Sequence, residues 1–209
     1  MNASTNAQMA TREGSRPACA EQRLKELDIK LPAPPEPFGT YAEAVQTGNL
    51  LFLTGMLPTE GHSAKFVGRV GAELNVEAGR AAAYLATLNV LAVAPQHLGS
   101  LDKVIRIVRL GVSVATSGDV RDQPKVADAA SELLQNVIGK EKNPCRPVYG
   151  VASLPLGTPV ELEVLQQLGS SLLLVGQTGE KDLAFRLGER TNPRPGADPA
   201  FATLQTANA

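Results

Sequence analysis

The 209-residue sequence contains only two cysteines and two histidines, and this scarcity excludes several classes of site. Cys19 and Cys145 are too few for a disulfide framework, so a reducing, cytoplasmic setting is the default expectation. Cys145 has no histidine near it in the sequence, which favours an inert thiol over a nucleophile. His62 and His97 stand alone in separate segments, whereas zinc ligands cluster at short spacings. We expect neither a metal nor a cofactor.

Excess charge of either sign is also missing. Lys and Arg number 20 against 21 Asp and Glu, and aromatic residues make up 4% of the chain. Because nucleic-acid surfaces are usually basic, this balance argues against an RNA-binding module without excluding a local basic patch. The glycines match no phosphate-binding loop or dinucleotide motif, and no Gly-x-Ser-x-Gly nucleophile motif occurs.

Long apolar runs are absent as well. None approaches the ~20 residues that span a bilayer, so we expect no membrane association. Residues 1–21 lack the apolar segment of a secretory signal and are predicted to be a disordered leader. Arg12 and Arg16 leave a weaker alternative open, an organelle-targeting segment. Residues 169–209 are rich in Gly, Pro, Thr and Asn, which predicts a largely disordered tail, although residues 172–175 could add a strand.

The segment between these ends, residues 22–168, carries the periodic apolar pattern and is predicted to form one domain. One or two helical turns are expected within residues 21–32. Extended runs on either side of Thr47-Gly48-Asn49 predict a hairpin, because Gly48 tolerates the positive φ of a tight turn. The strands predicted in this half are 41–46, 50–54 and a short edge strand at 66–70.

Two helices are predicted from their end signals. Asn75 can cap the first helix, and Pro95 is expected to end it or to kink its last turn. Asp122 is predicted to cap the second helix, and Gly139 to stop it. Between the helices, the hydrophobic alternation of residues 102–115 predicts a long strand with a bulge near Ile107.

Residues 145–165 contain two runs of β-forming residues around a Leu-Pro-Leu-Gly turn, which predicts an antiparallel hairpin. The resulting order of elements indicates an α+β sandwich with the helices on one face of the sheet. Strand parity places apolar residues on both faces, so the helix-free face needs a cover. We therefore predict a homo-oligomer.

Charged residues inside this predicted hairpin need an explanation. Arg146 opens the first run, and Glu161 and Glu163 alternate with apolar residues in the second. The plain interpretation is an arginine paired at a strand end and a solvated strand face. However, the carboxylates lie on the face that an oligomer would cover, and a buried carboxylate must be paired, protonated or used. Arg146 and Glu161 are therefore candidate site residues.

Three stretches resemble the RidA family, also called YjgF and historically labelled L-PSP endoribonuclease. They are "NLLFLTGMLP", "ADAASELL" and above all "RPVYGVASLPLGTPVELEV", which carries the family's Arg, Leu-Pro and Val-Glu-x-Glu signature. The resemblance runs from about Phe38 to Leu168, and "LPAPPEPFGTY" and "VGAELNVEAGR" resemble a less studied RidA-like branch. It implies a chorismate-mutase-like α+β fold, with a mixed six-stranded sheet and two helices on one face. It also implies a homotrimer with ligand clefts between subunits.

The resemblance further implies a reaction. Archetypal members hydrolyse the 2-imino acids released by PLP-dependent dehydratases to 2-keto acids and ammonia. At the matching positions, Arg146 would grip the substrate carboxylate and Glu161 would position a water molecule. Tyr41, Thr54 and Asp128 would border the substrate. The expected partners are thus a small 2-imino or 2-keto acid and two further copies of the chain.

The chain departs from the family pattern near these residues. Val148 replaces a cysteine, Met56 a glutamine and Asp128 an asparagine, while Pro147 removes a backbone N–H beside Arg146. Two alternatives to the deaminase stay open. The first is a non-catalytic trimer that binds small carboxylate metabolites, which the replacements favour. The second and weaker one is RNA cleavage, as the historical label suggests.

Overall fold

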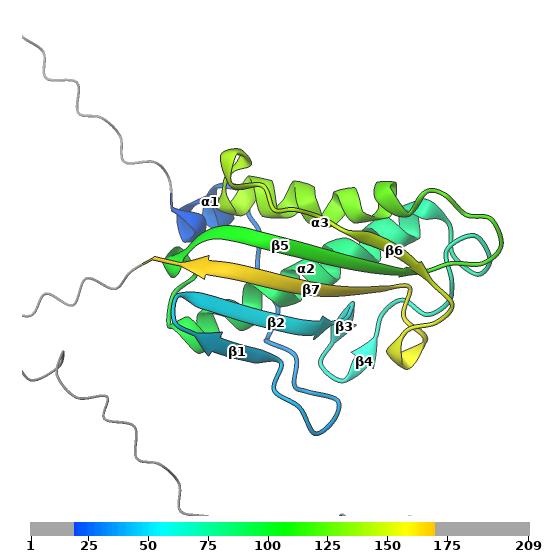
Figure 1. Ribbon diagram of the computed structural model, residues 1–209, viewed down its shortest axis with the longest axis horizontal. Coiled ribbons are helices and arrows are strands. Elements are labelled where there is room, and N and C mark those ends of the chain that lie inside the picture. The colour runs from blue at the N-terminus through cyan, green and yellow to red at the C-terminus, as the bar shows by residue number, and fades with distance from the viewer. Residues whose placement is uncertain (1–18, 170–209) are drawn as a thin grey trace, which may run out of the picture. The chain divides into compact units, whose positions relative to one another are not determined.

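The computed structural model describes residues 19–169 (Figure 1). The predicted leader as far as residue 18, and the predicted tail from residue 170 with its possible strand at 172–175, lie outside the described residues. The helices are α1 (Ala20–Glu26), α2 (Val76–Leu98) and α3 (Gln123–Ile138), with short 3-10 turns η1 (Leu101–Lys103), η2 (Lys140–Lys142) and η3 (Pro155–Gly157). The strands are β1 (Ala44–Thr47), β2 (Leu50–Met56), β3 (Thr59–Glu60), β4 (Ser63–Ala64), β5 (Val104–Ala115), β6 (Val148–Val151) and β7 (Val160–Leu168).

Five strands form one mixed sheet in the order β1-β2-β7-β5-β6. β5 and β6 run parallel, and the other neighbouring strands are antiparallel. β3 and β4 pair only with each other. Helices α2 and α3 lie against one face of the large sheet (Figure 1). The predicted α+β arrangement with helices on one face is confirmed.

The sheet has five strands within the described residues, not the six that were expected, because the predicted strand at 66–70 does not form. Gly68 and Gly71 have φ of 121° and 91°, so the chain turns on both sides of Val70. Val70 makes only isolated bridges, to Leu74 and to Thr116. The segment is held at the end of β5 instead, where the Val70 N–H donates to the Ala115 carbonyl at 2.9 Å.

The predicted hairpin at 145–165 is wrong, because β5 lies between β6 and β7. Val148 of β6 pairs with Val112 of β5, and Leu162 of β7 pairs with the same Val112 from the other side. The Leu-Pro-Leu-Gly segment therefore crosses the end of β5 rather than forming a hairpin turn. Its reversal takes place at Leu156 and Gly157, whose φ values are 55° and 68°.

The helix ends follow the predictions with one exception. The Asn75 side chain accepts the Ala78 N–H at 2.8 Å, which confirms the predicted cap of α2. Pro95 lies inside the last turn, and the helix continues to Leu98. Asp122 occupies the N-cap position just before α3, but its side chain caps no backbone N–H and pairs with Lys125 at 2.9 Å.

The predicted irregularity in β5 is confirmed. Its pairing with β7 shifts register twice, between Val104 and Arg106 and between Ile107 and Arg109. The second shift brings both Ile107 and Leu110, three residues apart, to the buried face. A bulge is what allows this odd spacing in a strand.

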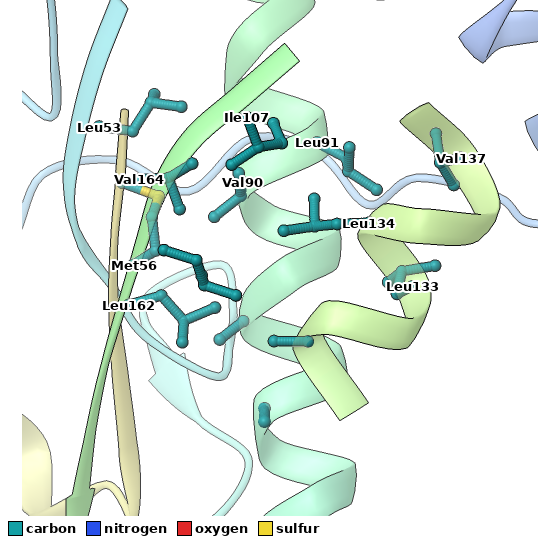
Figure 2. Packing of buried hydrophobic residues seen from close by; sticks show 14 of the residues in the cluster. Leu53, Met56, Val90, Leu91, Ile107, Leu133, Leu134, Val137, Leu162 and Val164 are labelled. Atoms are coloured by element: carbon teal, nitrogen blue, oxygen red, sulfur yellow. The ribbon is translucent and has the colours of Figure 1, made fainter. Parts of the chain in front are cut away.

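The core fills the space between the sheet and the two helices (Figure 2). Small residues on α2 allow close approach to its surroundings, as the alanine-rich sequence predicted. One such approach is at Gly79, where an added Cβ would lie 3.0 Å from Val126 Cγ2 of α3 and 3.0 Å from Val70 Cγ2. Both valines are almost fully buried. Valine has few alternative rotamers, so neither neighbour can move away easily.

Gly79→Ala is therefore expected to destabilise the fold by about 1 kcal/mol, measured by urea unfolding. Overpacking costs roughly 1–3 kcal/mol, which outweighs the helix-propensity gain of about 0.5–1 kcal/mol. The exposed neighbour offers a control, since Ala81→Gly should change only helix propensity. In a Val126→Ala background, Gly79→Ala should become neutral or stabilising. A stabilised single variant would contradict this packing argument.

Candidate functional site

A pocket of about 380 Å³ brings together three of the five residues singled out from the sequence. Tyr41 precedes β1, Thr54 lies on β2, and Glu161 lies on β7, next to β2 in the sheet. The other lining residues come from the same segments and from the η3 turn: Phe38, Gly39, Ala42, Gly55, Leu57 and Pro155.

Gly55 marks where the polar groups of this pocket converge. Its φ of 68° favours glycine, and a Cβ there would lie 3.6 Å from the Tyr41 hydroxyl and 3.8 Å from Glu161 Oε1. The hydroxyl also accepts the Phe38 backbone N–H at 3.4 Å. A phenol and a carboxylate thus flank a stretch of bare backbone, which leaves room for a small ligand.

Buried polar groups hold the walls of the pocket. The Asn89 side-chain amide, on α2, donates to the carbonyls of Leu57 and Thr59 at 2.8 and 3.0 Å. Next to the lining residue Pro155, Thr158 Oγ1 donates to the Pro155 carbonyl at 3.0 Å. Asn89 and Thr158 are almost fully buried, so these bonds are shielded from water.

Glu161 is half-buried on the helix-free face of the sheet, because its neighbours Val160 and Leu162 point into the core. Burial raises the pKa of its carboxyl group, and repulsion from Glu163 raises it further. A carboxylate with a raised pKa is a stronger base than an ordinary glutamate, which favours a role in proton transfer.

Arg146 lies in a different cluster. Its Nη1 donates to Asp128 Oδ1 and to Ser131 Oγ of α3, each at 2.8 Å. Within residues 19–169, Nε and Nη2 of Arg146 donate no hydrogen bond to a protein atom. Asp128 Oδ2 accepts no hydrogen bond from these residues either. The guanidinium is therefore fixed on one side and open on the other.

The two clusters occupy opposite faces of the sheet. Arg146 reaches α3, on the helix-covered face beside edge strand β6, whereas Glu161 points away from the helices on β7. β5 separates the strands, so the lateral offset alone is two strand spacings, about 10 Å. No hydrogen bond or ion pair among the described residues joins Arg146 to the pocket. A small acid could not contact both residues within one chain.

The family departures have structural reasons. Met56 packs in the core with its side chain 2% exposed, so it does not enter the pocket (Figure 2). Val148 faces the helix layer and packs against the core. The Pro147 carbonyl accepts the Val112 N–H of β5 at 3.1 Å. Because β6 is an edge strand, no strand lies on its other side to need the backbone N–H that proline lacks.

The helix-free face carries an ion pair among exposed apolar side chains. Arg109 Nη1 lies 3.0 Å from Glu163 Oε2, and this hydrogen bond raises the pKa of the arginine. Val45 of β1, Phe52 of β2 and Tyr149 of β6, at the other edge of the sheet, are each about half exposed on this face. The predicted two-sided apolar character of the sheet is thus observed.

Sequence reasoning missed several contributors. Ser131 lies one helical turn after Asp128, a spacing that signals a shared helix face. Phe38 and Gly55 lie beside the residues chosen from the sequence, but only the fold shows that they line the same pocket. A larger hollow of about 710 Å³ lies where α2 and α3 begin; Asp119, which lines it, is already paired with Arg121.

Comparison with known proteins identifies the family to which this fold belongs. A family model described as "YjgF/chorismate_mutase-like, putative endoribonuclease" matches residues 21–168. The chain belongs to the YjgF family, also called RidA. A solved structure of an endoribonuclease-named protein from Shewanella oneidensis MR-1 matches this YjgF chain with a TM-score of 0.69 and 28% identity, covering 72% of it and 100% of that chain.

Two curated relatives are similar in sequence to this YjgF protein. Protein TCP17 of Trypanosoma cruzi is 38% identical over 148 residues, which cover 70% of this chain and 92% of that protein. The 2-iminobutanoate/2-iminopropanoate deaminase of Dermatophagoides farinae is 29% identical over 135 residues, covering 65% and 91%.

Residues 19–169 lack two features that would indicate other functions. No helix there is long and apolar enough to cross a membrane. No group of three or more His, Cys, Asp and Glu side chains in this part of the chain is placed to hold a metal ion.

Glu161→Gln is expected to stabilise the fold more at neutral than at acid pH. A raised folded-state pKa means that the folded chain binds the proton more tightly, so the wild type loses stability as the pH rises from about 4.3 through the raised value. The amide does not titrate. The difference in free energy of unfolding, variant minus wild type, should therefore grow between about pH 3.5 and pH 7 in urea titrations.

The same comparison in a Glu163→Gln background is the control. The growth with pH should shrink but persist, because burial contributes more than Glu163 to the raised pKa. A difference that stays constant with pH would show that the Glu161 carboxyl is not perturbed.

Proposed function

We propose that this YjgF protein hydrolyses 2-imino acids to 2-keto acids and ammonia in a site shared between subunits of a homotrimer. The observation that carries the proposal is the pairing of an open guanidinium with a separate pocket that holds a carboxyl of raised pKa. A protein 29% identical to the chain is named 2-iminobutanoate/2-iminopropanoate deaminase, which supports this reaction class.

The substrate determines what the site must supply. A protonated 2-imino acid has a carboxylate beside an electrophilic C=N bond, so no covalent nucleophile is required. Nε and Nη2 of Arg146 offer two parallel donors that match a carboxylate, each charge-assisted bond contributing about 1.5–3 kcal/mol. Most of the rate gain would come from holding the acid beside an oriented water.

Glu161 would handle the protons. Its carboxylate takes a proton from water as the oxygen bonds to C2 and the C=N π electrons move to nitrogen. The protonated carboxyl then returns that proton to the amino nitrogen. The C–N bond breaks as the hydroxyl oxygen forms the C=O bond of the 2-keto acid, and the hydroxyl proton passes to the Glu161 carboxylate and from there to the departing ammonia, which leaves as ammonium. The raised pKa suits both steps, because the group must bind and release the proton in one cycle. The Tyr41 hydroxyl and Thr54 border the same space.

Arg146 and the Glu161 pocket can contact the same ligand only if different copies of the chain supply them. Arg146 and Glu161 lie on opposite faces of one chain, and the exposed apolar side chains of the helix-free face provide a surface for a second copy. Three copies related by a rotation would each give Arg146 to one cleft and Glu161 to the next.

Arg146→Ala is expected to lower kcat/KM for enzyme-generated 2-iminobutanoate by about 100-fold or more, because two charge-assisted bonds are lost. Glu161→Gln should lower kcat by a similar factor through the loss of proton transfer. The matched control is Arg121→Ala, which removes an exposed arginine paired with Asp119 outside both clusters. Activity unchanged by Arg146→Ala would refute the proposed role of the guanidinium.

Mixing the two inactive variants tests the shared site. Subunits carrying Arg146→Ala or Glu161→Gln, unfolded and refolded together in equal amounts, should recover about one quarter of the wild-type activity, because each residue is intact in half of the subunits. Light scattering should give the mass of a trimer. A mixture as inactive as its components, or a stable monomer with full activity, would exclude a shared site.

Non-catalytic binding of a small carboxylate is the second candidate, and the Arg146–Asp128 pair favours it. The Asp128 carboxylate partly neutralises the positive charge of Arg146, which weakens the attraction of a substrate carboxylate. Val148, two residues after Arg146, has no reactive group. Calorimetric binding of 2-keto acids without turnover of the imine would select this function.

A further inference from the structure

We propose that His62 is a positioning residue that holds one wall of the Glu161 pocket in place. The wall is the segment 36–41, which brings Phe38 and Tyr41 to the pocket. His62 lies outside this segment, in the turn between β3 and β4. The inference deepens the proposed function and rests on its assignment of this pocket to the substrate. The position of the wall can also be measured without a ligand.

The segment 36–41 is anchored at its two ends rather than along its length. Pro35 is buried, and beyond the segment the Glu43 carbonyl accepts the Thr54 N–H of β2 at 3.2 Å. Among the described residues, no backbone-to-backbone hydrogen bond joins the segment itself to another part of the chain. A wall held in this way depends on side-chain contacts to keep its position.

Contacts inside the segment shape it without fixing it to the rest of the fold. The Tyr41 N–H donates to the Gly39 carbonyl at 3.0 Å, and the Phe38 N–H donates to the Tyr41 hydroxyl at 3.4 Å. The side chains of Phe38 and Tyr41 are both partly exposed and lie outside the hydrophobic core. The wall can therefore shift as one unit unless a residue outside it holds it.

His62 supplies that outside contact. Its Nε2 lies 3.1 Å from Glu36 Oε2, and its ring meets the Phe38 ring edge to face with the centroids 5.7 Å apart. The ion pair is exposed, with side-chain exposures of 63% and 78%, so it contributes little alone, and the aromatic contact adds to it. Together the two contacts determine where the segment lies and how the Phe38 ring faces.

The β3–β4 hairpin gives His62 a rigid base. Asn89 of α2 donates to the Thr59 carbonyl at 3.0 Å, and both residues are almost fully buried. On the other side of the hairpin, the Lys65 N–H donates to the Pro58 carbonyl at 3.0 Å. His62 thus connects a segment with few anchors to a hairpin that is fixed to the core.

The position of the wall determines the space available to a ligand. A Cβ at Gly55 would lie 3.6 Å from the Tyr41 hydroxyl and 3.8 Å from Glu161 Oε1, so the phenol and the carboxylate face the same small space. An outward shift of the wall removes contacts to a bound acid in the ground state and in the transition state alike. Loss of His62 should therefore weaken binding more than it slows the chemical step.

His62→Ala is expected to raise KM for enzyme-generated 2-iminobutanoate by roughly three- to tenfold, with kcat changed by less than about twofold. If the imine is not turned over, the Kd of 2-oxobutanoate from calorimetry takes the place of KM. His62→Gln keeps an N–H for Glu36 without the ring, and His62→Phe keeps the ring without the N–H. Each should fall between the wild type and His62→Ala.

The matched control is Lys65→Ala. It removes an exposed ion pair of the same hairpin, in which Lys65 Nζ lies 2.8 Å from Glu60 Oε2, and it keeps the backbone N–H that bonds Pro58. It should change neither KM nor Kd.

A fluorescence measurement follows the wall without a ligand. The protein has no tryptophan, so Phe38→Trp places a single reporter on the wall. Acrylamide should quench this reporter more strongly when His62→Ala is added, whereas adding Lys65→Ala should leave the quenching unchanged. A merely structural loss elsewhere in the hairpin would not separate these two variants.

The outcomes separate this inference from the proposed function. Stronger quenching together with a higher KM or Kd in His62→Ala supports it, whether or not the imine is turned over. Unchanged quenching, unchanged binding, or a fall in kcat at constant KM would overturn it. A protein that neither hydrolyses the imine nor binds 2-oxobutanoate refutes the proposed function, and the quenching then decides alone whether His62 positions the wall.

Discussion

The parallel pairing of β6 with β5 is the constraint on which the arrangement of the site depends. It places β6 at the edge of the sheet, where the Cys145 and Pro147 carbonyls accept N–H groups of β5 and Arg146 between them turns toward α3. The same strand order pushes β7 inward, next to β2, so that Glu161 shares a pocket with Tyr41 and Thr54. Had β6 and β7 paired as a hairpin, the two charges would lie on adjacent strands. The fold instead sends them to different surfaces.

Much of the fold follows from local signals in the sequence. The Asn75 cap, the bulge near Ile107 and the apolar parity of β7 depend on neighbouring residues, and all three are observed. Local signals could not show whether the hairpin predicted at residues 145–165 forms. Two β-forming runs joined by a turn satisfy the same local pattern whether they pair with each other or with a third strand between them. The choice is made by long-range packing, here by a 12-residue strand that pairs along both edges.

In the candidate site, too, local signals in the sequence identified some features, whereas others depend on long-range packing. Residue types and spacing identified Arg146 and Glu161 as unusual, because charges inside extended apolar runs need a reason. The resemblance to the YjgF family added Tyr41, Thr54 and Asp128. Neither line of reasoning could show that Asp128 holds Arg146, since the two residues come from different elements and meet only when α3 packs beside β6. Nor could it show that Met56 points into the core, because that depends on the register of β2.

The helix-free face links the pocket to assembly through electrostatics. Glu161, Glu163 and Arg109 lie on it among side chains that one chain leaves half exposed. A second copy packed there would remove water from the Arg109–Glu163 pair, which strengthens their attraction and costs both groups their hydration. It would also bury Glu161 further, and burial is already the main cause of its raised pKa. Assembly on this face would therefore both build the cleft and tune its proton-transfer group, since the contact that covers the apolar residues is the one that removes water from the carboxyl.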